Sequence, residues 1–436
     1  MTFKTWRSVV AVIACGLSMA SAWAGSVLLT GATIHTVSGP NLANGSLLIR
    51  DGKIAAIGVR LTEPADKTVD LKGQHLYPGL ISPTTVLGLV EIDSVRATHD
   101  VSEAGEYTPD VYTWMAVNPD SEHIPVTRAN GYTHVEAIPR GGIVSGFSGV
   151  IQLAGWTIED LAVKRVAALH LNWPSFNLDT TPKDKAANKD RWKSIEDQVK
   201  EREKRIKEID DFFTEAEAYA KAKTGSGASN GFKVIPAWEA MLPVLKREVP
   251  IFLHAEEYRQ IKSAVEWSLR RKYRASLIGG RDAWRLASTL ATNRIDVAYD
   301  AVFDQPGRDT DPYDVHYAAP GILSAAGVKV SFSEGPDHMG ASNIRNTPYD
   351  AAQAVAFGLS PEEALRGLTM YPAQLLGVGD RLGTIEIGKD ASLFVADGDI
   401  LDLRAHVTRM WIAGEEVSLE NRQSRLYEKY RGRPKK

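Results

Sequence analysis

The middle of this sequence alternates short apolar runs with segments of helical pattern, and this alternation constrains the fold most strongly. A strand covered by helices on both faces is apolar along its whole length, whereas a half-exposed strand alternates apolar and polar residues. Eight such apolar runs are found, at residues 76–81, 133–138, 150–153, 167–171, 250–254, 275–278, 296–298 and 329–333. Eight strands separated by helices predict an α/β fold, a (β/α)8 TIM-type barrel.

Both ends of the chain have a different pattern, in which short β-rich runs are broken by glycine turns. Turns of the Asp51-Gly52 kind join antiparallel strands in hairpins. We predict that residues 25–78 and 380–418 together form a small composite β-sandwich. Residues 79–379 are then the barrel, and residues 419–436 are a solvated C-terminal tail.

A charged segment near residues 183–223 interrupts the barrel pattern. It contains helix-stabilising pairs four residues apart, such as Glu201 with Arg205 and Glu203 with Lys207. We predict a helical insertion here. A solvated helix over a barrel loop is favoured over a lid or a partner-docking arm, because helices with dispersed charges usually face water.

Residues 1–24 are typical of a secretory signal peptide. Lys4 and Arg7 precede an apolar run, and Ala-Trp-Ala at residues 22–24 has the small residues of a cleavage site. We therefore expect a periplasmic or secreted protein. The single cysteine, Cys15, would be removed with the signal, and the mature chain would form no disulfide. The alternative, favoured less, is a lipoprotein box that leaves Cys15 acylated.

Charge and hydropathy argue against a nucleic-acid partner and against a membrane-spanning segment. The 51 basic and 54 acidic residues are mixed along the 436-residue chain and give a formal net charge of -3, with no basic stripe for nucleic acid. After the signal, no apolar run approaches the roughly 20 residues that a membrane-spanning helix needs. We expect neither a nucleic-acid partner nor a transmembrane segment.

Two sets of motifs resemble the amidohydrolase superfamily, specifically its imidazolonepropionase-like branch. Residues 77–81 read Tyr-Pro-Gly-Leu-Ile and follow the Asp-Gly-Lys-Ile of residues 51–54, as at the family's entry into barrel strand 1. Residues 365–414 resemble the exit from the barrel, with Gly-Lys-Asp-Ala at 388–391 and Trp-Ile-Ala-Gly at 411–414. The resemblance implies a barrel with a composite β-sandwich, and hydrolysis of carbon–nitrogen bonds other than peptide bonds, assisted by a divalent metal, most often zinc.

Most of the metal ligands that the resemblance implies are absent. The family places an aspartate and two histidines after strand 1, where this chain has Ser82, Thr84 and Val86. A histidine is also implied on strand 6, where the chain has Gly279-Gly280. Zinc in proteins is bound by Cys, His, Asp and Glu side chains, and not by threonine or valine.

Some polar residues do match the family's pattern. His254 matches the strand-5 histidine, and Glu334 stands where the strand-8 aspartate acts as proton shuttle. Glu256, Asp337 and His338 are further candidates to complete a metal shell with His254. We therefore predict catalytic roles for His254 and Glu334, and a metal set of His254, Glu256, Asp337 and His338.

Two other features are interpreted as structural. His170 and His316 are more simply explained as hydrogen-bonded histidines than as ligands. The Gly-rich residues 140–149 lack the lysine and spacing of a phosphate loop, which favours a tight loop.

Two hypotheses follow for function. The first is an amidohydrolase-type hydrolase with a depleted or rebuilt metal site, using a divalent metal when active and acting on a small molecule. The second is a catalytically inactive protein of the same fold, without metal, that binds a ligand or pairs with an intact relative. A homo-oligomer is compatible with either hypothesis.

Overall fold

The computed structural model describes residues 25–225 and 232–434. The predicted signal peptide and Cys15 therefore lie outside the described residues. Among the described residues, no helix is long and apolar enough to cross a membrane.

The two chain ends share one eight-stranded sheet, in the order β18-β17-β16-β5-β1-β2-β3, with β4 paired to β1. Strand β5 links the halves, because it pairs in parallel with β1 and antiparallel with the C-terminal β16. In the described residues the strands of both chain ends are joined in this one sheet, and the composite β-sandwich predicted for residues 25–78 and 380–418 stays a prediction. They are β1 (Val27–Ile34), β2 (Leu42–Arg50), β3 (Lys53–Gly58), β4 (Lys67–Asp70), β5 (His75–Pro78), β16 (Leu393–Ala396), β17 (Val407–Ile412) and β18 (Glu415–Glu416).

The remaining strands form two mixed sheets, in the orders β10-β9-β7-β6 and β15-β14-β13-β12-β11-β8. Five neighbouring strands of the second sheet, from β11 to β15, run parallel. The strands are β6 (Leu80–Thr85), β7 (Tyr132–Ala137), β8 (Val144–Phe147), β9 (Gly149–Gln152), β10 (Ala162–Lys164), β11 (Leu169–Asn172), β12 (Ile251–Ala255), β13 (Ala275–Gly279), β14 (Val297–Tyr299) and β15 (Val330–Phe332).

The predicted α/β fold is confirmed, but no closed barrel is seen among the described residues. At one side the chain passes directly from β8 in one sheet to β9 in the other. At the other side no backbone ladder joins β6 to the three-residue strand β15. Side chains bridge this gap instead, since Ser333 Oγ donates to the carbonyl oxygen of Thr84 at 3.2 Å.

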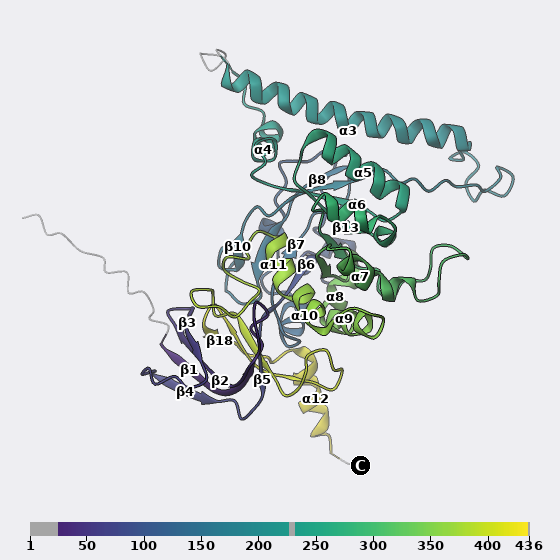
Figure 1. The fold of residues 1–436 in the computed structure, drawn as a ribbon. Coiled ribbons are helices and arrows are strands. Elements are labelled where there is room, and N and C mark those ends of the chain that lie inside the picture. Colours follow the sequence, from purple (N-terminus) through teal and green to yellow (C-terminus); the bar gives the residue numbers. More distant parts are fainter. Residues whose placement is uncertain (1–24, 226–231, 435–436) are drawn as a thin grey trace, which may run out of the picture.

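Helices cover the outer side of the parallel strands. Helix α5 packs against β12 and β13, while α7 and α9 pack against β15, and these helices follow one another down one side of the molecule (Figure 1). The helices are α1 (His123–Arg128), α2 (Ile158–Leu161), α3 (Ile195–Thr224), α4 (Pro236–Leu245), α5 (Tyr258–Arg271), α6 (Ala287–Thr292), α7 (Val315–Ala325), α8 (His338–Asn343), α9 (Thr347–Ala356), α10 (Pro361–Leu368), α11 (Met370–Leu375) and α12 (Arg422–Arg431).

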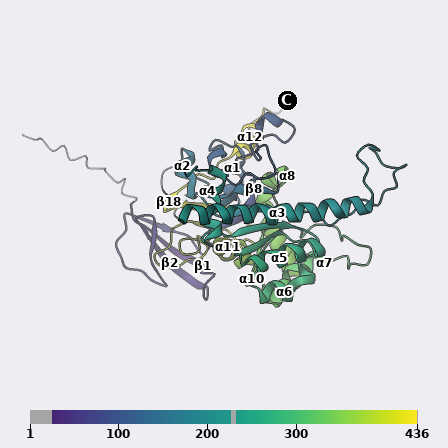
Figure 2. The ribbon, with the colours of Figure 1, turned by 90° about the horizontal axis from the view of Figure 1, so that it is seen from above.

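The charged segment near residues 183–223 contains the 30-residue helix α3. Its buried residues, including Ile209, Phe213 and Ala216, lie on one face, and Phe213 contacts the Trp267 ring of α5 edge-on at 4.9 Å. Figure 2 shows α3 lying across the α/β part, with its N-terminal end reaching beyond it. In the predicted C-terminal tail, residues Arg422–Arg431 form the exposed helix α12, and Asn421 caps its first turn.

Candidate functional site

The carboxyl ends of the parallel strands bring the candidate residues to one edge of the sheet. His254 lies near the end of β12 and Gly279 ends β13, while Asp300 and Glu334 follow β14 and β15 closely. Ligand sites of barrel and open α/β proteins lie at this edge. The candidate site is therefore in the region where a ligand is expected.

A line of three side chains runs from the partly buried His254 into the interior. His254 Nε2 lies 2.8 Å from His170 Nδ1 on β11, and His170 Nε2 lies 3.8 Å from Glu136 Oε1 on β7. Ser148 Oγ donates to the same Glu136 oxygen at 2.6 Å. Glu136 and His170 are fully buried, and neither Glu136 Oε2 nor His170 Nε2 has a hydrogen-bond partner within the described structure.

Burial favours the uncharged form of each group in this line. Burial lowers the pKa of His170 to about 3, and burial together with the neighbouring His170 ring lowers the pKa of His254 well below its usual value. Burial also raises the pKa of the Glu136 carboxyl well above its usual range. Because His254 Nε2 is hydrogen-bonded to His170, Nδ1 is the His254 ring nitrogen without a partner among the described residues, and it carries no hydrogen when Nε2 is the donor of that bond. Such a nitrogen can accept a proton or bind an electrophile.

Several carboxyl groups lie on the β13 to β15 side of the site. Glu256 is exposed, yet loss of solvation is the largest cause of its raised pKa. A side chain in an open depression is both exposed to water and surrounded by protein, which explains the exposure and the raised pKa together. Loss of solvation, followed by the charge of Glu256, also raises the pKa of Asp300 well above its usual value, and Asp337 adds to this effect.

Glu334 is paired with Asp350 of helix α9. Burial raises the pKa of Glu334 to about 7, although a hydrogen bond from Asp350 opposes the rise. Burial and the Glu334 charge raise the pKa of Asp350 to about 9. The pair therefore holds at least one proton near neutral pH, which Asp350 donates to the Glu334 carboxylate. Within the described part of the chain, no hydrogen bond joins either residue to His254.

The strand-1 positions do not fit the metal centre that the resemblance implies. Thr84 and Val86 are 1% and 0% exposed, and the Thr84 hydroxyl is hydrogen-bonded to the Ser333 hydroxyl. The space that two imidazole ligands would need is thus filled by a hydroxyl pair and packed aliphatic groups. At the strand-6 position, Gly279 has φ +83° and the Glu256 carboxylate lies directly against it, which leaves no room for a longer side chain.

No hydrogen bond or ion pair within residues 25–225 and 232–434 joins any two of the predicted metal ligands. Glu256 accepts a hydrogen bond from the backbone N–H of Arg281 at 3.1 Å, and Asp337 caps α8 by accepting from Gly340. His338 begins α8, and its side chain lies outside the described part. In the described part, no group of three or more His, Cys, Asp or Glu side chains is arranged to hold a metal ion.

His170 and His316 are both hydrogen-bonded, as the sequence interpretation expected. His170 is hydrogen-bonded to His254, and buried His316 Nδ1 lies 3.1 Å from the Tyr299 hydroxyl. Glu136 was not predicted, although a carboxylate within the apolar run of residues 133–138 is an unusual signal. The Gly-rich residues 140–149 do not form the expected loop alone, because β8 and the start of β9 lie within them.

Comparisons with known proteins agree on one type of fold. A model of the Amidohydrolase family matches residues 315–418. The structure of an amidohydrolase from Thermotoga maritima MSB8 superposes with a TM-score of 0.78 at 26% sequence identity, covering 90% of this chain and 99% of that one. The described fold is therefore similar to that structure over almost its whole length.

Similarity to curated proteins is local. Amidohydrolase tasK from Hapsidospora irregularis is 39% identical over 72 residues, which are 16% of this chain and 7% of that protein. N-acetylglucosamine-6-phosphate deacetylase from Danio rerio is 44% identical over 62 residues, 14% of each. The matched segments thus span only a small part of these relatives.

Proposed function

We propose that this chain is a member of the amidohydrolase superfamily that binds a small molecule at its strand ends without metal-centred hydrolysis. The full-length structural similarity and the family match support the membership, and the motifs at residues 51–54 and 77–81 favour the imidazolonepropionase-like branch. In this proposal β6, β7, β8 and β11 to β15 correspond to the eight strands of the family's barrel. The sheet of the chain ends corresponds to its smaller domain.

One observation carries the functional part of the proposal. Thr84 and Val86 are buried and packed, with Thr84 bonded across the gap to Ser333. A metal site needs ligands whose donor atoms converge on one point, and losing several of them removes most of the binding free energy. The positions of the first two ligands have become part of the packed interior, which supports binding without metal-dependent chemistry.

A second candidate function is a carbon–nitrogen hydrolase with a rebuilt site. The free Nδ1 of His254 and the proton-holding pair of Glu334 and Asp350 favour it. A neutral imidazole can take a proton from an attacking water, and a carboxyl with a pKa about 7 can return a proton to the leaving amine. Both groups are at the edge of the sheet where the substrate of such an enzyme would lie.

An activity screen separates the two candidates. Amides, lactams and dipeptides are incubated with the protein, with His254→Ala and with Glu334→Gln, and the release of amine is measured. His406→Ala, at an exposed residue directly before β17, is the matched control. The proposal predicts no turnover above that of the His254→Ala variant. Turnover that is lost in both site variants and kept in the control would overturn it and establish the hydrolase.

A further inference from the structure

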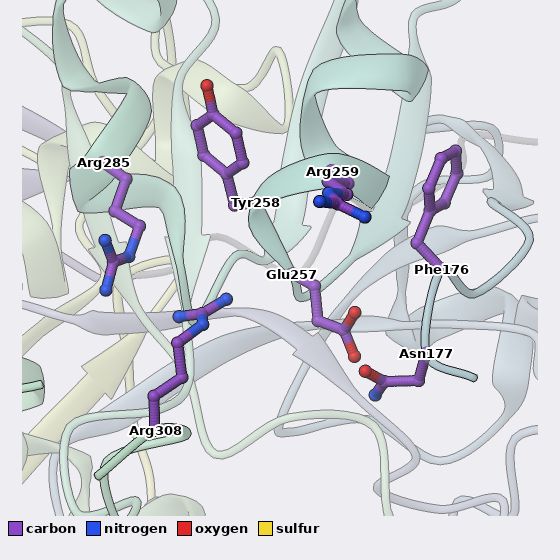
Figure 3. A pocket seen from close by; sticks show the side chains of 7 residues that line it. All are labelled: Phe176, Asn177, Glu257, Tyr258, Arg259, Arg285 and Arg308. Atoms are coloured by element: carbon purple, nitrogen blue, oxygen red, sulfur yellow. The ribbon is translucent and has the colours of Figure 1, made fainter. Parts of the chain in front are cut away.

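A cavity of about 630 Å³ lies at the carboxyl ends of β11 to β14 (Figure 3). Its lining comes from the segments that follow four neighbouring parallel strands. Asn177 follows β11, Tyr258 and Arg259 follow β12, Arg285 follows β13, and Arg308 follows β14. Because all these segments leave the same edge of the sheet, the cavity belongs to the region where this fold binds ligands.

Two of the arginines are fixed by buried aspartates. Arg308 donates from Nη2 and Nη1 to the two carboxylate oxygens of Asp282, at 2.6 and 3.2 Å. Arg308 also reaches Asp311 at 3.3 Å, and Arg285 is hydrogen-bonded to the same Asp311. The aspartate side chains are only 4% exposed, whereas those of Arg285 and Arg308 are 31% and 44% exposed. The carboxylates therefore lie behind, and the guanidinium groups face the cavity.

Arg259 is the third arginine of the cavity and has no internal partner. Among the described residues its side chain makes no hydrogen bond, ion pair or ring contact. It lies in the first turn of helix α5, which begins at Tyr258 and has 14 residues. A helix of this length has a partial positive charge at its N-terminus, which favours anions. The N–H groups of Tyr258 and Gln260 in this turn are already used, by Asp282 and by the Glu257 side chain.

The single carboxyl group in the lining is that of Glu257, which accepts a hydrogen bond from the backbone N–H of Gln260 in the capping box of α5. Burial raises its pKa. Figure 3 shows its carboxyl group pointing toward the amide of Asn177 and away from Arg285 and Arg308. The arginine side of the cavity thus presents hydrogen-bond donors that the protein itself does not satisfy.

We propose that this cavity binds an oxyanion, a carboxylate or a phosphate, of the small molecule that the site holds. The inference rests on the proposed function, since it assigns a chemical class to that ligand. Guanidinium groups bind both oxyanions through paired, charge-assisted hydrogen bonds. Arg285 and Arg308 are pre-oriented by their aspartates, and Arg259 supplies the charge that no internal partner neutralises.

The test is isothermal titration calorimetry of the purified protein with inorganic phosphate and, separately, with succinate. Chloride at constant ionic strength provides the background. We expect saturable binding of at least one oxyanion at one site per chain. Arg259→Gln removes one charge-assisted hydrogen bond without leaving a buried partner, and it should weaken this binding about tenfold. Arg60→Gln, at an exposed arginine in the loop after β3, should leave it unchanged.

The outcomes are distinct. Preference for phosphate identifies a phosphorylated ligand, and preference for succinate identifies a carboxylate, and either supports the inference if Arg259→Gln weakens it. Binding no stronger than that of chloride, or equal binding by both variants, would overturn it. The titration needs neither metal nor turnover. If the chain hydrolyses amides and also binds the oxyanion, the proposed function is refuted and this inference stands. If it neither hydrolyses amides nor binds the oxyanion, this inference is refuted and the absence of hydrolysis stands.

Discussion

Asp350→Asn should make the protein more stable at neutral pH, and the gain should disappear in acid. Asp350 is 8% exposed and is hydrogen-bonded to Glu334. The folded protein holds the Asp350 proton because burial and the Glu334 charge raise its pKa from 3.8 to about 9. An asparagine keeps a donor for the Glu334 carboxylate but has no proton to lose.

The sign and size of the effect follow from linkage. A carboxyl whose pKa is raised on folding contributes stability that is complete below the unfolded value, here 3.8. That stability is lost as the pH rises toward the folded value, at about 1.4 kcal/mol per pH unit. At pH 7 the loss approaches about 4 kcal/mol as an upper bound. The asparagine variant avoids this loss, so its advantage should grow steadily between about pH 4 and pH 7.

Urea unfolding of both proteins at about pH 4.5 and pH 7.5 measures the effect. We expect a gain of several kcal/mol in the free energy of unfolding at the higher pH and little difference at the lower pH. Asp309→Asn, at an exposed aspartate, is the matched control and should show no such dependence. An equal difference between wild type and Asp350→Asn at both pH values would refute the reasoning.

Two further perturbations test the geometry of the site. Gly279→Ala should destabilise the protein by more than the roughly 1–2 kcal/mol of a left-handed alanine, because the new Cβ would collide with the Glu256 carboxylate. Gly327→Ala, also at positive φ but with nothing within 4 Å, should lose only the strain energy in thermal unfolding. His170→Gln should raise the pKa of His254, since burial and then the His170 ring lower it. An unchanged pKa of His254 in an NMR titration would contradict the proximity of the two rings.

The parallel strands were predictable because both of their faces are buried. Residues 250–254 and 275–278 are largely apolar, and β12 and β13 lie within or next to these ranges. Strand β8 was not predicted, because Ser145 and Gly146 interrupt its apolar pattern. In the structure Gly146 has φ +113°. Glycine at such a position reads as a turn unless the pairing of the strand is known.

The closure of the barrel and the pairing of site residues depend on contacts that sequence pattern does not contain. The sequence pattern of eight strand-like runs does not show whether the first and last strands pair. In the structure Thr84 and Ser333 contact each other through hydrogen bonds of their side chains. The contact of His254 with His170 joins residues 84 positions apart. The position of His254 was predictable, whereas its partner and the buried Glu136 were not.

Metal content tests the central claim most directly. The protein is purified without a chelator or a histidine tag, incubated with zinc, desalted and measured by plasma mass spectrometry beside its His254→Ala variant. The account predicts that neither protein retains a stoichiometric metal, because the strand-1 positions are packed and the remaining donors do not converge. About one zinc, manganese or iron per chain in the wild type, lost in His254→Ala, would contradict it and establish a rebuilt metal site.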